Sequence, residues 1–124
     1  MTIIEAINKV DILKPNSYTH TEKVKWLSNL DWVIKAQIID THEGGDAIEF
    51  NGYDVNNTDT EQELLVPAPY DDIYIKWLEA QIDYTNAEFG KYNNSITAYN
   101  TLYSAFERYY NRHHMPIQHK MKFF

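Results

Sequence analysis

The sequence predicts an all-α protein, a small bundle of about four helices with a long central loop. Apolar residues recur every three or four positions in four stretches of the chain, which is the spacing of a helix with one buried face. Residues 43–70 lack this spacing and contain three of the four glycines. At 124 residues the chain has the size of one domain, so we expect residues 1–124 to fold as a single helical unit.

The first helix is predicted at the N-terminus. Thr2 and Glu5 have the spacing of a capping box, in which two side chains bind backbone N–H groups that the helix leaves free. Pro15 is expected to end the helix, because proline disfavours helical geometry in the residue before it. The apolar positions between these signals have helical spacing: Ile3, Ile4, Ile7 and Val10.

The second helix is predicted to be longer. Thr19 or Thr21 can cap it, because a threonine hydroxyl accepts a hydrogen bond from a backbone N–H in the first turn. We expect it to continue to about His42, a length of roughly 30 Å, before Gly44-Gly45 stop it. Its apolar face consists of Val24, Leu27, Leu30, Ile34 and Ile38.

Residues 43–70, hereafter the acidic loop, are expected to carry a short β-hairpin. Asn51-Gly52 is a strong turn signal, and residues 48–53 alternate between apolar and polar side chains. Pro67 and Pro69 each disfavour helix in the preceding residue, so the loop should end in an extended segment. A connection this long in a compact domain is usually functional or mobile.

Two further helices are predicted after the loop. The third begins near Asp71-Asp72, acids that suit the positive end of a helix dipole, and ends at about Phe89. Gly90 and Asn93-Asn94 are predicted to form the turn that follows. The fourth helix ends before Pro116 and should pack antiparallel to the third. Its apolar face consists of Ile96, Tyr99, Leu102, Tyr103, Phe106 and Tyr110.

Charge is unevenly distributed along the chain, whose formal net charge is −7. Between Lys35 and Lys76 there is no Lys or Arg, but there are ten acids: Asp40, Glu43, Asp46, Glu49, Asp54, Asp59, Glu61, Glu63, Asp71 and Asp72. From Arg108 onward the sign reverses, with four Lys or Arg and no acidic side chain. Because affinity for phosphates comes mainly from Lys and Arg, the composition argues against a general nucleic-acid binder.

The composition also indicates a cellular compartment. The chain has no cysteine, so disulfides and thiolate metal sites are excluded and a reducing compartment is expected. The N-terminus lacks the basic region of a signal peptide, and no window approaches the roughly 18 consecutive apolar residues of a membrane span. We therefore expect a protein made in the cytosol that does not contact a membrane.

Two groups of residues could carry acid–base or metal chemistry. One is the set of C-terminal histidines, His113, His114 and His119. Adjacent side chains on a helix point about 100° apart, so the first two suit a single metal ion poorly. The other group could transfer protons at the end of the second helix and consists of Asp40, His42 and Glu43. No nucleophile in a recognisable motif accompanies it.

A calcium site in the acidic loop is a third possibility. Its oxygen ligands would be Asp46, Glu49, Asp54 and Asp59, whose spacing does not follow a known calcium-binding loop. The alternatives are a solvated loop and an acidic lining past which DNA moves without binding. We predict no enzymatic activity, no metal, no cofactor and no small-molecule substrate.

Aromatic and cationic side chains outside the predicted core stripes are candidates for contact with another chain, since such residues dominate protein interfaces. In the acidic loop they are Phe50 and Tyr53. In the fourth helical region they are Tyr92, Tyr109 and Arg112. In the C-terminal tail, residues 116–124, they are Lys120, Lys122, Phe123 and Phe124.

Several stretches of the sequence together resemble a known family. Two of them are Val66-Pro67-Ala68-Pro69-Tyr70-Asp71 and Lys91-Tyr92-Asn93-Asn94-Ser95. The others are residues 8–10, 13–16, 22–23, 26–28, 30–31, 38–42, 63–65, 74, 78–84, 110–112 and 114–116. The chain resembles, nearly end to end, the small head–tail connector or adaptor proteins of tailed phages and of prophages in Gram-positive hosts. Two departures are Trp32, where the family pattern has glycine, and Gly90, which is unusual within the long helical region.

The resemblance implies a mostly helical subunit without catalytic residues. Such subunits assemble as a ring, dodecameric by family analogy, beneath the portal protein, and they join the DNA-filled head to the stopper or tail proteins. The implied location is the host cytoplasm during assembly and then the head–tail junction of the virion. Under this hypothesis residues 43–66 face the DNA channel or a neighbouring subunit, and residues 108–124 dock on the portal.

Two other functional hypotheses fit the composition. A tail-completion or stopper protein of the same virion would share these partners but lie one layer lower. A small cellular helical regulator could use a basic C-terminal helix to bind DNA, which requires base-reading side chains on a basic face. The fourth predicted helix instead carries a tyrosine-rich stripe with few cations.

Overall fold

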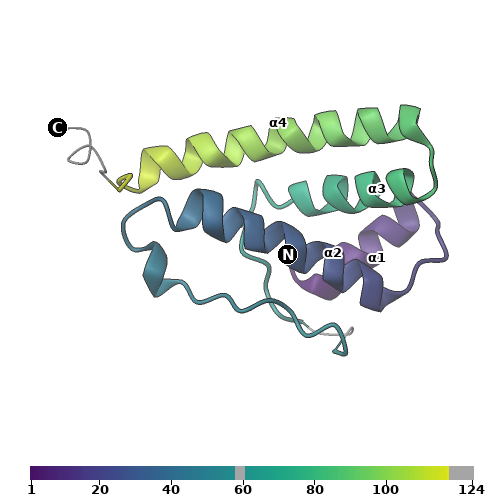
Figure 1. The fold of residues 1–124 in the computed structure, drawn as a ribbon, viewed down its shortest axis with the longest axis horizontal. Coiled ribbons are helices and arrows are strands. Elements are labelled where there is room, and N and C mark those ends of the chain that lie inside the picture. The colour runs from purple at the N-terminus through teal and green to yellow at the C-terminus, as the bar shows by residue number, and fades with distance from the viewer. Residues whose placement is uncertain (58–60, 118–124) are drawn as a thin grey trace.

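A computed structural model describes residues 1–57 and 61–117. In chain order its helical elements are α1 (Ile3–Leu13), α2 (His20–Ile34), the π-helical turn η1 (Lys35–Ile39), the 3-10 turn η2 (Gly45–Ala47), α3 (Ile73–Thr85) and α4 (Phe89–His113). The described part contains no strand longer than a single bridge. The predicted all-α bundle with a long central loop is confirmed (Figure 1).

The bundle is organised around α3, which packs against α1, α2 and α4. Figure 1 shows α4 antiparallel to α3 along one edge of the molecule, with the acidic loop along the opposite edge. The core is aliphatic where the first three helices meet and aromatic where α4 joins them, at Tyr99, Phe106 and Tyr110. None of the helices in the described ranges is long and apolar enough to cross a membrane.

The predicted start signals of the first two helices are confirmed. Thr2 and Glu5 form the capping box of α1, with each side chain bound to the other's backbone N–H at 3.2 and 3.0 Å. Thr19, not Thr21, caps α2 by accepting a hydrogen bond from the backbone N–H of Glu22 at 3.1 Å. Of the four apolar positions predicted for this helix, Ile3, Ile7 and Val10 are buried, as is Ala6, whereas Ile4 is half-buried.

The second helix does not remain α-helical to His42. It widens into η1, where the backbone N–H of Asp40 donates to the carbonyl of Lys35 at 2.8 Å. The carbonyl of Ile38 then accepts from two side chains, the hydroxyl of Thr41 at 2.8 Å and a ring nitrogen of His42 at 2.5 Å. The π-helical turn therefore places His42 in the core, 4% exposed.

The prediction for the turn between the last two helices is wrong. Gly90 and Asn93-Asn94 lie within α4, and the turn is formed by residues 86–88, in which Ala87 has a φ of +59°. The hydroxyl of Ser95 donates to the buried carboxylate of Asp83 at 3.0 Å. Packing of the early turns of α4 on the end of α3 overrides the low helix propensity of glycine and asparagine. The antiparallel arrangement itself is as predicted.

The hairpin predicted around Asn51-Gly52 is not confirmed. Gly52 adopts the left-handed φ of +85° that the turn signal requires, but residues 48–57 form no ladder with one another. Their partner is α2: the ring of Phe50 lies 4.9 Å from that of Trp32, and the N–H of Tyr53 donates to the hydroxyl of Ser28 at 3.1 Å. A Cβ on Gly52 would lie 3.3 Å from both Ser28 Oγ and Trp32 Nε1, so the backbone approaches the helix closely.

Candidate interaction surface

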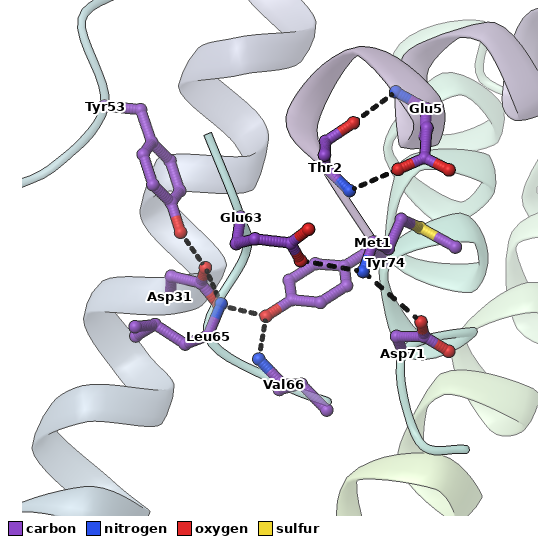
Figure 2. Close-up of polar contacts among 10 residues, drawn as sticks. All are labelled: Met1, Thr2, Glu5, Asp31, Tyr53, Glu63, Leu65, Val66, Asp71 and Tyr74. Atoms are coloured by element: carbon purple, nitrogen blue, oxygen red, sulfur yellow. Dashed lines mark hydrogen bonds and ion pairs between the residues drawn. The ribbon is translucent and has the colours of Figure 1, made fainter. Parts of the chain in front are cut away.

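A buried carboxylate on α2 holds the acidic loop at two points, Tyr53 and Leu65 (Figure 2). Asp31 is fully buried, and it accepts hydrogen bonds from the Tyr53 hydroxyl on the loop, from the Tyr74 hydroxyl on α3 at 2.7 Å, and from the N–H of Leu65 at 3.2 Å. Tyr74 accepts in turn from the N–H of Val66 at 2.7 Å. We call these five residues, which are Asp31, Tyr53, Leu65, Val66 and Tyr74, the Asp31 cluster.

The Asp31 cluster contains no cation. Burial raises the pKa of Asp31 to about 6, although the hydrogen bonds from Tyr53, Tyr74 and the N–H of Leu65 favour the ionised form. Burial and the neighbouring carboxylate raise the pKa of both phenols, so Tyr53 and Tyr74 remain protonated hydrogen-bond donors at neutral pH. Asp31 is therefore held by neutral hydrogen-bond donors and not by an ion pair. Its carboxyl group fixes the positions of the two phenols.

The N-terminus also binds the end of the acidic loop. The N–H of Ile3 donates to the carbonyl of Gln62, and the N–H of Leu64 donates to the carbonyl of Met1, both at 3.0 Å. The amino group of Met1 lies 3.1 Å from a carboxylate oxygen of Glu63 and 3.5 Å from one of Asp71 (Figure 2). Residues 62–66 are therefore attached to α1 on one side and to α2 and α3 on the other.

These attachments separate the loop into buried anchors and an exposed acidic part. Tyr53, Leu64 and Val66 are buried, whereas the carboxylates of Asp54, Glu61 and Glu63 belong to exposed residues. Within the described ranges, the acids predicted to face DNA or a neighbour thus lie on the surface.

Phe50 and Tyr53, which the sequence predicted as interface residues, are buried within the chain itself. They are 9% and 6% exposed, and their rings pack on each other at 5.0 Å. Both side chains fill the space between the loop and α2, so each offers little surface to a partner chain. Trp32, which packs on Phe50, stays exposed, at 47%.

Exposed aromatic side chains gather instead around the turn between α3 and α4. Tyr84 and Phe89 are 60% and 55% exposed, and their ring centroids lie 5.9 Å apart. Tyr92, which the sequence predicted as an interface residue, is half-buried against Tyr84 at 5.4 Å. We call Tyr84, Phe89 and Tyr92 the turn patch.

A second exposed apolar group lies at the other end of α4. Met115 and Ile117 are 60% and 39% exposed, and the segment that carries them pairs with the end of α2. The N–H of Glu43 donates to the carbonyl of Met115 at 2.8 Å, and the N–H of Ile117 donates to that of Thr41 at 2.9 Å. We call Met115 and Ile117 the tail patch.

The remaining predicted interface residues lie near the tail patch or beyond the described part. Arg112 is exposed, whereas Tyr109 is half-buried between the rings of Tyr70 and His113, with centroid distances of 5.0 and 4.4 Å. The other four fall outside the described residues: Lys120, Lys122, Phe123 and Phe124.

The acid–base group suggested by the sequence lines an open depression of about 670 Å³ beside the tail patch. Its histidine is not free to exchange protons with a ligand there. Both ring nitrogens of His42 are occupied, one by the carbonyl of Ile38 at 2.5 Å and the other by the side-chain oxygen of Asn111 at 2.6 Å. Asp40 is paired with Lys35. His42 therefore joins the segment after η1 to α4.

No three side chains that could hold a metal ion come together within the described ranges. Of the histidines, His113 is exposed and His114 stacks on Tyr110 with ring centroids 3.8 Å apart, while His119 lies outside the described residues. Asp59, the fourth oxygen ligand of the suggested calcium site, also lies outside them.

Asp31 is the important residue that the sequence-based search missed. One signal pointed to it: it falls at helical spacing on the apolar face of α2, between Leu27 and Ile34. An acid at such a position is buried and needs hydrogen-bond donors, which come from distant parts of the chain.

Comparison with protein-family models, with curated proteins and with solved structures found no match.

Proposed function

We propose that the chain is a structural subunit of a tailed-phage or prophage virion, a head–tail connector that assembles as a ring beneath the portal protein. The observation that carries the proposal is the pair of exposed apolar groups on different surfaces, the turn patch and the tail patch. They lie at opposite ends of α4, whose 25 residues span about 37 Å. A closed ring needs head-to-tail contacts between two different surfaces of each copy.

Two other features support the proposal. The helical fold has the class that the resemblance implies, and the resembling segment around residues 63–71 forms the anchored exit of the acidic loop. The loop also presents exposed carboxylates and no cation in the described ranges 43–57 and 61–70. Repeated around a ring, such a surface would give DNA phosphates no partner to bind.

The direct test is to mix the purified chain with the assembled portal protein of the same phage or prophage. Electron microscopy should then show an added ring at the lower rim of the portal. A chain that leaves the portal unchanged at micromolar concentrations would contradict the connector assignment, and added density one layer lower, seen only with a further neck protein, would favour a stopper.

The role of the turn patch is tested by the double variant Tyr84→Gln and Phe89→Gln. It should retain the helical circular dichroism of the parent chain, because both side chains are more than half exposed, and it should lose ring density on the portal. The matched control is Thr97→Ala with Asn100→Ala, which changes exposed residues of α4 away from both patches. Equal binding by the two double variants would remove the turn patch from the ring contact.

The C-terminal tail is tested separately by charge reversal. Lys120→Glu with Lys122→Glu should weaken capture of the chain by immobilised portal if the tail docks there. Unchanged capture would remove the tail from the portal contact while leaving the ring contact to the experiment above.

A further inference from the structure

We propose that Asp31 is a proton-sensitive latch: ionisation of its buried carboxyl group loosens the hold of the core on the acidic loop at Tyr53 and at residues 65–66. The inference concerns the chain itself and holds whatever the chain assembles with. It rests on the geometry of the Asp31 cluster, in which one carboxyl group on α2 binds α3 and two separate points of the loop (Figure 2).

The position of Asp31 makes its ionised form costly in the closed structure. The residue is fully buried, and no ion pair reaches it within the described ranges. All three of its hydrogen-bond donors are neutral. A buried ionised carboxylate without a cation is disfavoured unless it regains water, and only opening of the cluster can supply that water.

The groups around Asp31 leave it as the site that titrates near neutral pH. The loop contributes the phenol of Tyr53 and α3 contributes that of Tyr74, both protonated at neutral pH. On α2 the neighbouring polar group is the hydroxyl of Ser28, which is not ionisable. The charged groups at the N-terminus pair among themselves, since the amino group of Met1 is bound to Glu63 and Asp71.

The direction of the effect follows from proton linkage. With the cluster closed, Asp31 has a pKa of about 6; in the open form it would return towards its ordinary value of 3.8. The closed form therefore binds the proton more tightly, so opening becomes more favourable as the pH rises from about 4 to about 6 and changes little above that. A difference of about two pH units limits the increase in the opening equilibrium to about a hundredfold.

Three backbone N–H groups within the cluster report its opening. The N–H of Tyr53 donates to Ser28, that of Leu65 to Asp31, and that of Val66 to the hydroxyl of Tyr74. Their hydrogen exchange can be followed by NMR on the full chain at about pH 4.5 and about pH 7.5, after division by the intrinsic exchange rates. Protection of all three should fall between these two pH values by up to about twenty-five-fold, because the open form is already largely ionised at about pH 4.5.

Two comparisons make the experiment decisive. Amides in the middle of α1 and α3, such as those of Ile7 and Leu78, should change much less; an equal loss throughout the core would show that Asp31 is linked to global unfolding and would overturn the latch. Asp31→Asn, which cannot ionise, should abolish the pH dependence at the three reporters. If the Asp31→Asn variant kept the pH dependence of exchange at the three amides, a different titratable group would be responsible for it.

Direct titration keeps the proposal testable even if the variant does not fold. The carboxyl carbon of Asp31 in the unmodified chain should titrate by NMR with a midpoint near 6. Tyr53→Phe removes a hydrogen bond to the ionised form and should move this midpoint upward. A midpoint in the ordinary aspartate range would refute the latch.

Discussion

The two fully buried aspartates of the core are stabilised in opposite ways. Asp83 receives a cation: the ammonium group of Lys14 lies 2.6 and 2.7 Å from its two carboxylate oxygens, and the hydroxyl of Ser95 completes the set at 3.0 Å. Asp31 receives only neutral donors. The first arrangement fixes α1 to the α3–α4 pair, and the second makes the attachment of the acidic loop dependent on a proton.

Removing the cation from Asp83 should destabilise the fold. Lys14→Met keeps most of the aliphatic length of the side chain but leaves a buried carboxylate without its ion pair, which typically costs about 3–5 kcal/mol. Because about a quarter of the Lys14 side chain is exposed to solvent, we expect a loss nearer the lower end of that range. Urea unfolding followed by circular dichroism measures the loss.

The control for this prediction is Lys91→Met, which removes an exposed partner of Glu88 in the first turn of α4 and should leave stability unchanged. The double variant Lys14→Met with Asp83→Leu should recover part of the loss, because no buried charge remains. If Lys14→Met and Lys91→Met were equally stable, the Lys14–Asp83 pair would have no special role in the core.

Only part of the Asp31 cluster could be predicted from the sequence. The helical spacing of Leu27, Asp31 and Ile34 is readable from the sequence and predicts a buried acid. The hydrogen-bond donors of Asp31 cannot be identified from the sequence. Tyr53 and Tyr74 lie 22 and 43 positions away, and only the packing of the loop and α3 on α2 brings them together. Tyr53 was assigned to an interface for the same reason: its exposure depends on that packing.

Among the secondary-structure elements, helix starts and stops set by local chemistry were predictable. The Thr2–Glu5 capping box and the Thr19 cap are contacts within four residues, so the sequence contains all the information they need. The start of α4 was not predictable in this way, because the contact of Ser95 with Asp83 joins two helices. The π-helical turn of residues 35–39 has no local signal either, since its Gln37 side chain accepts a hydrogen bond from the hydroxyl of Tyr103 on α4.

The inclusion of Gly90 in α4 leads to a prediction about that helix. A Cβ added to Gly90 would meet nothing within 4 Å, and alanine is a better helix former than glycine. Gly90→Ala should therefore stabilise the chain by a few tenths to about 1 kcal/mol, measured by urea unfolding.

The contrasting variant is Gly52→Ala. Gly52 has a φ of +85° and lies close to Ser28 and Trp32, so a side chain there is strained and should cost about 1–2 kcal/mol. Stabilisation by both changes would contradict the left-handed turn at Gly52, and destabilisation by both would contradict the helical position of Gly90.

Over the whole molecule, charge is separated between two edges. The acidic loop lies along one edge, and α4, with the cations Lys91, Arg108 and Arg112 against the single acid Glu107, lies along the other (Figure 1). The sequence showed the uneven distribution of charge along the chain, but its placement on two edges depends on how the helices pack. It could not predict the turn patch and the tail patch, because their positions depend on where α4 begins and ends.

The charge separation predicts how assembly on the portal should respond to salt. Each copy carries a formal charge of −7, so neighbouring copies in a ring repel one another, and this repulsion is screened as the Debye length falls from about 20 Å near 20 mM salt to about 8 Å near 150 mM. Contacts through the apolar patches are not weakened by the same change. Ring formation on the portal should therefore strengthen as the salt concentration rises from about 20 to about 150 mM. Sedimentation at several salt concentrations measures it.

The same titration distinguishes the two contacts of the proposed subunit. Charge reversal at Lys120 and Lys122 should change only the ionic contribution to portal binding. The portal binding of that variant should therefore increase with salt more steeply than that of the parent chain. The variant with glutamine at positions 84 and 89 loses the apolar contact and should stay weak at every salt concentration. Binding of the parent chain that falls steadily with salt would mean that ion pairs, and not the apolar patches, hold the ring together.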